Sequence, residues 1–172
     1  AASGFSPNDT VKLNQDILYC RDMDWSGVTN SPTLWNAGQQ ILAVYGSLTF
    51  APDMDDQFTG DWRFRATTPG QTITSNGHSF LSTVYFEGIG GEWTMQDAFE
   101  TESSVYHQEG ILRSNNNPLK IGSHWNFING SETFGTPELY LGTSLMEFKN
   151  YSQTYFSVYG PSALCVDASH IV

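Results

Sequence analysis

Basic residues are scarce in this sequence. Only 7 Lys and Arg stand against 18 Asp and Glu in 172 residues, which gives a formal net charge of −11 at pH 7. The few basic residues are scattered along the chain, whereas binding to a phosphate backbone requires clustered Lys and Arg. The composition therefore excludes nucleic acids as partners.

Long apolar runs are missing as well. No stretch of the sequence approaches the roughly 20 apolar residues that a membrane-spanning helix needs, so we predict no membrane span. Heptads, internal repeats and extended helical periodicity are not visible either. However, 39% of the residues are hydrophobic and 14% are aromatic, which is enough to fill a core. We expect one folded domain that spans residues 1–172.

Cysteine is nearly absent: only Cys20 and Cys165 occur, near opposite ends of the chain. Neither lies in a C-x-x-C spacing, so a zinc site is not indicated. Two interpretations remain open. A disulfide between them closes nearly the whole chain and contributes on the order of 4–5 kcal/mol in the loop-entropy model. Alternatively, the two thiols are separate and pack as small apolar side chains.

The residues that are present favour β-structure. Residues 40–50 alternate with period two, and residues 80–86 and 155–159 are rich in β-branched and aromatic side chains. Asn76-Gly77 and Asn129-Gly130 are typical of hairpin turns. Thr94 and the residues after it resemble a helix start, so we expect one or two helical turns there. These patterns predict an all-β fold, an antiparallel β-sandwich that is jelly-roll-like or a related barrel.

Aromatic side chains beside short polar ones are the best functional clue. Indole and phenol rings stack on the C–H faces of sugars, and Asp or Asn side chains bind sugar hydroxyls. Each of the five tryptophans lies near Gly, Asn, Asp or Ser. Inward alternation should bury about half of them, and we expect at least one exposed ring. The carbohydrate-binding residues that we predict are Asp24, Trp25, Trp62, Trp93, Trp125 and Asn126.

The densest charge feature is an acidic segment. Four carboxylates fall within nine residues, and a Ca²⁺ ion bound by their oxygens would relieve their repulsion. The spacing does not match an EF-hand loop, and a solvated acidic turn is the alternative. We expect no other cofactor. The candidate calcium ligands are Asp53, Asp55, Asp56 and Asp61.

Two sets of residues keep an enzymatic alternative open. His78, Ser79 and Asp97 supply the residue types of a hydrolytic triad, although neighbouring residues of a strand point to opposite faces. Glu87 and Glu92 flank a glycine-rich turn and could form the carboxylate pair of a glycosidase. Glu87 and Glu92 are also explained as exposed acidic residues, and His78 and Ser79 as part of a polar turn. Neither set is therefore favoured as catalytic.

Together these features predict a non-enzymatic, lectin-like domain that binds a glycan or a glycosylated receptor. The composition, which is acidic and rich in Asn and aromatic residues, resembles that of viral attachment or protruding capsid domains and of secreted carbohydrate-binding modules. This resemblance indicates an extracellular or virion-surface location. A homo-oligomer would add avidity to weak single sites. The alternatives are a secreted hydrolase acting on glycans or esters and a structural capsid or assembly domain.

Overall fold

The strands of this protein pair in parallel. The computed structural model describes residues 4–128, 136–149, 156–159, 163–166 and 170–171. These residues form nineteen β-strands, and every pairing among them is parallel. The chain winds into a parallel β-solenoid of about five turns. The prediction of an antiparallel β-sandwich is therefore wrong, although the all-β class is confirmed.

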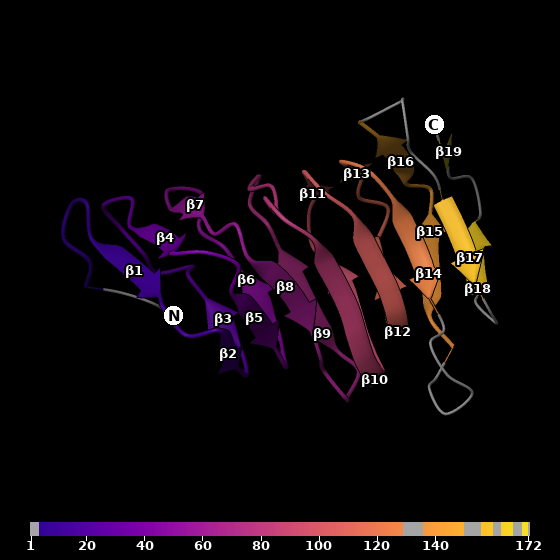
Figure 1. Cartoon of the computed structure of the whole chain (residues 1–172). Helices are drawn as coiled ribbons and strands as arrows, with labels where there is room; N and C mark the ends of the chain where they lie inside the picture. Colours follow the sequence, from indigo (N-terminus) through magenta and orange to yellow (C-terminus); the bar gives the residue numbers. More distant parts are fainter. Residues whose placement is uncertain (1–3, 129–135, 150–155, 160–162, 167–169, 172) are drawn as a thin grey trace.

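The coils stack from the N-terminal strands to the last strands along one axis (Figure 1). Successive coils place residues 19 to 31 positions apart in register, and the longest offset joins Trp125 to Phe156. For example, Ile17 pairs with Ile41, Leu42 with Trp62, and Trp62 with Val84, at offsets of 24, 20 and 22 residues. Each coil therefore adds one layer to a column of side chains, and neighbouring layers are separated by the strand spacing of about 4.8 Å.

Three sheets line the solenoid. A three-stranded sheet contains β1 (Thr10–Leu13), β4 (Thr33–Asn36) and β7 (Asp55–Gln57). A four-stranded sheet contains β11 (Phe99–Thr101), β13 (Leu119–Ile121), β16 (Leu145–Phe148) and β19 (His170–Ile171).

The third sheet has twelve strands in two branches. One branch contains β2 (Ile17–Cys20), β5 (Ile41–Val44), β8 (Asp61–Phe64), β14 (Trp125–Ile128) and β17 (Phe156–Tyr159). The other contains β3 (Met23–Asp24), β6 (Leu48–Thr49), β9 (Gln71–Thr74), β15 (Glu138–Gly142) and β18 (Ala163–Val166). The long strands β10 (Val84–Met95) and β12 (Val105–Arg113) bend and run through both branches.

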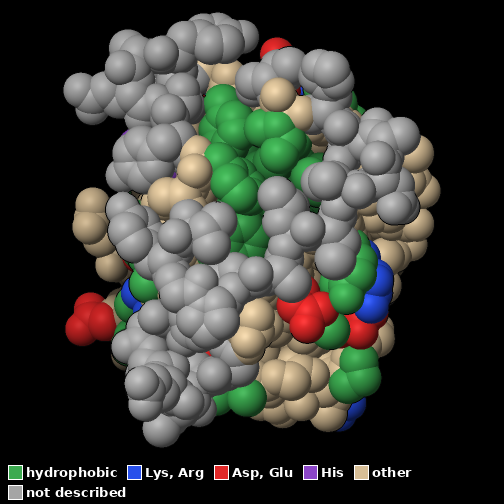
Figure 2. Space-filling model, turned by 90° about the vertical axis from the view of Figure 1, so that its right-hand side faces the viewer, with side chains coloured by type: hydrophobic (Ala, Val, Ile, Leu, Met, Phe, Trp, Pro, Cys, Tyr) green, Lys and Arg blue, Asp and Glu red, His purple; other side chains and the backbone are tan. Residues whose placement is uncertain are grey.

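Alternate residues of each strand point into the solenoid and form its core. Aromatic rings of successive coils contact one another there, for example Phe64 with Phe86 at 5.1 Å between centroids, and Phe86 also contacts Trp93 of its own strand at 5.4 Å. His107 lies in the same interior, where burial lowers its pKa to about 4 and keeps the imidazole neutral. From the end that carries β17 and β18, described hydrophobic side chains gather at the centre and acidic ones lie farther out (Figure 2).

The turn signals in the sequence mark corners of the coils. Asn76 and Gly77 have φ values of 49° and 86°, as the Asn-Gly pair predicts, but they connect β9 to the next parallel segment. No hairpin forms there. Asn129-Gly130 lies outside the described residues. The predicted helical turn is also absent: Thr94 and Met95 end β10, and Phe99 begins β11.

The two cysteines belong to opposite ends of the stack. Cys20 is in the first coil, in β2, and it is a free thiol near the carbonyl of Ala43. Cys165 is in β18, several coils away, whereas the Cα atoms of a disulfide lie within about 7 Å of each other. Of the two alternatives, the separate thiol therefore holds for Cys20, and burial raises the pKa of this thiol to about 11.

Candidate functional site

Most of the predicted sugar-stacking rings are buried. Trp62, Trp93 and Trp125 are fully inaccessible, and Trp25 is 5% exposed beneath Phe5, whose ring stacks on it at 5.8 Å. These indoles occupy inward positions of the strands or the capped end of the core. None of the four offers a free face, so the expectation that they form stacking platforms is corrected.

The two polar residues predicted beside them have local roles. Asp24 is exposed, and hydrogen bonds from the side chain and from the backbone N–H of Ser26, the latter at 2.8 Å, lower the pKa of its carboxyl. Asn126 is buried, and its Oδ1 accepts a hydrogen bond from the hydroxyl of Ser157 at 2.6 Å. With the neighbouring indoles buried, these contacts do not assemble a sugar site.

The triad residues do not contact one another in the hydrogen bonds of the described chain. The Asp97 carboxylate accepts hydrogen bonds from the N–H groups of Ser75 and Asn76 at 2.8 and 2.5 Å. His78 Nε2 lies 2.8 Å from the carbonyl oxygen of Ala51. The Ser79 hydroxyl donates to a carboxylate, Glu102 Oε1, at 2.8 Å. Each group thus has its own partner, and among the described residues no histidine accepts a hydrogen bond from the Ser79 hydroxyl.

The glutamates considered as a glycosidase pair are bound to arginines. Glu87 accepts hydrogen bonds from Arg63 and Arg65, both at 2.7 Å, and Glu92 accepts one from Arg113 at 2.6 Å. A cleft of about 350 Å³ lies beside Glu92, lined also by Gly91, Gly110 and Glu138 among others. Because arginine side chains occupy both carboxyl groups, Glu87 and Glu92 do not face each other across a cleft as the carboxyl pair of a glycosidase does.

The four aspartates of the predicted calcium site do not converge. Among the described residues, no group of three or more His, Cys, Asp or Glu side chains is placed to hold a metal ion. Asp53 is exposed in a turn, Asp55 points outward from β7, and Asp61 faces Arg63 at 3.9 Å. Neighbouring residues of β7 point to opposite faces of the sheet, so the carboxylates of Asp55 and Asp56 lie on different sides of the strand.

Asp56 is half-buried, as Asp61 is, whereas Asp53 and Asp55 are exposed. Its Oδ1 accepts a hydrogen bond from the N–H of Phe58 at 3.0 Å, and its Oδ2 has no hydrogen-bond partner in the described chain. Loss of hydration raises the pKa of Asp56 to about 6, the nearby Asp55 charge adds to this effect, and the Phe58 N–H and His78 oppose it.

Asp56→Asn should change how stability depends on pH. A carboxyl with a raised pKa stabilises the fold while it is protonated, and this contribution is lost as pH rises from about 4 to above 6. Relative to the wild type, the variant should gain about 2–3 kcal/mol in unfolding free energy between pH 4 and pH 7.5. Urea unfolding at both pH values measures the difference. Asp53→Asn, at an exposed neighbour, should show no such gain.

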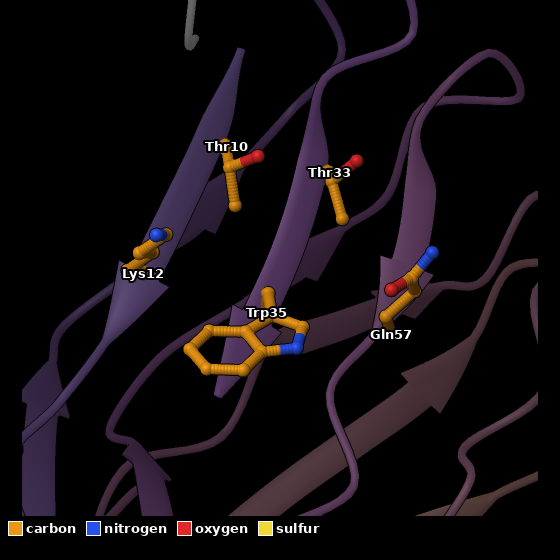
Figure 3. A pocket seen from close by; sticks show the side chains of 5 residues that line it. All are labelled: Thr10, Lys12, Thr33, Trp35 and Gln57. Atoms are coloured by element: carbon orange, nitrogen blue, oxygen red, sulfur yellow. The ribbon is translucent and has the colours of Figure 1, made fainter. Parts of the chain in front are cut away.

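One tryptophan remains accessible on the outside of the solenoid. Trp35 is partly exposed on β4, the central strand of the three-stranded sheet. The indole lines a groove of about 260 Å³ together with Thr10 and Lys12 of β1, Thr33 of β4 and Gln57 of β7. Figure 3 shows these five side chains on the same side of three adjacent strands.

The register of the strands explains this grouping. Lys12 pairs with Trp35 and Trp35 with Gln57, so these three side chains form one outward row across the sheet. A second row contains Thr10, Thr33 and Asp55, two residues earlier on each strand. Leu34, between the rows, is fully buried. The inward anchoring of Leu34 therefore holds Trp35 outward.

Hydrogen bonds organise one side of the groove. The Asp55 carboxylate accepts a bond from Gln57 Nε2 at 2.6 Å and lies 3.4 Å from the hydroxyl of Thr33. On the other side, Lys12 Nζ lies 5.6 Å from the centroid of the Trp35 ring. The groove thus combines an aromatic face with hydroxyl, amide and ammonium groups.

Sequence reasoning named Trp35 among the five tryptophans but left it out of the predicted site. A signal for it was present: at offsets of 23 and 22 residues, Trp35 aligns with Lys12 and Gln57, which are both polar. An aromatic residue in a polar outward row is exposed. Without the coil repeat, this row cannot be recognised.

Comparison with known proteins gave no match, since no family model, no curated protein and no solved structure is significantly similar to the chain. Among the described residues, no helix has the length and apolar character required to cross a membrane.

Proposed function

We propose that this protein is a carbohydrate-binding solenoid that takes a sugar ring in the Trp35 groove, as a recognition module of a secreted or virion surface. The observation that carries the proposal is the outward Trp35 ring, which lies between Lys12 and Gln57 in one row and beside the polar row of Thr10, Thr33 and Asp55. A pyranose laid on the indole has Thr10 and Thr33 hydroxyls on one side and the Gln57 amide on another. This combination satisfies both the apolar face and the hydroxyl groups of a sugar.

The affinity of one groove should be modest. A single ring contact contributes about 0.5–1.5 kcal/mol beyond the area that it buries. The groove is also shallow and open, which supports recognition of a surface-displayed chain rather than enclosure of a small metabolite. Repeated copies of the protein on one surface would raise the overall affinity by avidity.

Trp35→Ala should reduce saccharide affinity about tenfold, whereas Trp35→Tyr should retain most of it because a flat ring remains. Glycan-array screening followed by titration calorimetry on the best saccharide measures the change. Tyr19→Ala removes a ring that is more exposed but lies outside the groove, so it should leave binding unchanged. Blank arrays, or equal binding by the alanine variant and the wild type, would contradict the proposal.

Fluorescence quenching provides a second measurement. Trp35 is the most accessible indole of the described structure, so acrylamide should quench mainly its emission, and a bound sugar should protect it. Protection that rises with protein concentration in the absence of sugar would instead support an assembly interface.

A further inference from the structure

The basic residues of this acidic protein are nearly all neutralised by carboxylates. Seven Lys and Arg occur in the sequence, and five of them form ion pairs in the described structure. These pairs are Arg21–Asp22, Arg63–Asp61, Arg63–Glu87, Arg65–Glu87, Arg113–Glu92, Lys149–Glu100 and Lys149–Glu102. Among the described residues, only Lys12 and Lys120 have no carboxylate within ion-pair distance.

The surroundings of these two lysines differ. Lys120 lies in register between Glu100 and Glu147 on the neighbouring strands, so carboxylates flank it on both sides. The in-register neighbour of Lys12 is Trp35. Asp55, in register with Thr33, belongs to β7 on the far side of the groove, and its carboxylate is bound to Gln57 and Thr33. Lys12 is therefore an exposed cation with an aromatic neighbour and with no carboxylate partner among the residues that the structure describes.

The position of Lys12 matches a substituent of a stacked sugar. A ring in van der Waals contact with the indole lies about 3.5–4.0 Å above it. Lys12 Nζ lies over the Trp35 ring, 5.6 Å from the indole centroid, so its ammonium is on the same side of the indole as a stacked sugar and within reach of that sugar's substituents. An anionic substituent there would form a charge-assisted hydrogen bond, which is about twice as strong as one between neutral groups.

We infer that the saccharide taken by the Trp35 groove is acidic, with a carboxylate or sulfate directed toward Lys12 and its hydroxyls toward Gln57 and Asp55. This inference rests on the proposed function. It also sets one orientation of the ligand, because the cation lies on the β1 side and the carboxylate on the β7 side of the indole. The reverse orientation places the anion of the ligand against Asp55.

The test uses the full chain and three matched probes: a neutral oligosaccharide, the corresponding uronate and a sulfated form. The wild type should bind one or both acidic probes about tenfold more tightly than the neutral one. Comparing the affinities for the uronate and the sulfated probe shows whether a carboxylate or a sulfate is preferred. Lys12→Gln should abolish this preference, and Lys12→Arg should retain it. Lys120→Gln, at the other lysine without an ion pair, should leave the preference unchanged.

The outcomes separate the two proposals. Equal affinity for neutral and acidic probes, combined with loss of binding in Trp35→Ala, overturns the acidic specificity and supports the sugar site. A preference that survives Lys12→Gln also overturns the role of Lys12. Absence of binding by all three probes and across the glycan array contradicts the sugar site itself. Circular dichroism of each variant shows whether the fold is retained.

Discussion

Phe80→Ala is expected to lower the free energy of unfolding by about 3–5 kcal/mol, the range for removing a fully buried phenylalanine ring. The ring lies in the middle of the stack. Its centroid is 5.1 Å from that of Phe99, 5.4 Å from that of Trp62 and 5.8 Å from that of Phe50. These neighbours belong to different coils, so the cavity would weaken the contact between the two halves of the solenoid.

Urea unfolding followed by tryptophan fluorescence measures this loss. Leu81→Ala is the matched control, because Leu81 is the next residue and is 40% exposed. Its replacement should cost under about 1 kcal/mol, as is usual for surface positions. Equal losses at the two positions would show that Phe80 does not hold neighbouring coils together.

Gly110→Ala is expected to be similarly damaging, at about 3 kcal/mol or more, for a reason of backbone geometry. Gly110 has a φ of +79°, which costs an L-residue about 1–2 kcal/mol. An added Cβ would also lie 2.8 Å from the carbonyl oxygens of both Gly88 and Gly91. Such overpacking adds typically 1–3 kcal/mol, because the neighbouring backbone of β10 must move.

Gly77→Ala separates these two contributions. Gly77 has a φ of +86°, and an added Cβ would meet no atom within 4 Å. This variant should therefore lose only the conformational cost, about 1–2 kcal/mol. Thermal unfolding of both variants beside the wild type makes the comparison. If Gly110→Ala loses no more than Gly77→Ala, the close approach of β10 and β12 at this bend is not a constraint on the fold.

The turns at the corners of the coils explain why the prediction of an antiparallel sandwich was wrong. Alternation in residues 40–50 and the Asn-Gly turn at residues 76–77 are features of strands and tight turns in general. They do not reveal whether the next strand returns antiparallel or continues around a coil. Polar turns recur near Asn8, Asn30, Asp53 and Asn76, at steps of 22 or 23 residues, and this spacing is the trace of the coil. Since the intervening strands differ in sequence, it was not visible as a repeat.

Prediction of the candidate site was limited in the same way, because local sequence patterns do not show which residues of different coils lie side by side. The expectation of an exposed indole beside polar side chains was made from composition, and Trp35 meets it. The four predicted tryptophans have equally polar neighbours in sequence, yet three of them point inward from their strands and Phe5 covers the fourth, Trp25. Neighbours in sequence lie on opposite faces of a strand, whereas neighbours in the groove come from residues 22 or 23 positions away.

Strand propensity, turn chemistry and charge are local or additive properties, so the sequence alone was enough to identify an acidic all-β protein that is rich in aromatic rings and poor in basic residues. Only the tertiary structure decided the direction of strand pairing, the burial of four indoles and the meeting of Lys12, Trp35 and Gln57 on one outer face. Those features depend on the register between successive coils, which is set by how the buried side chains stack along the whole solenoid.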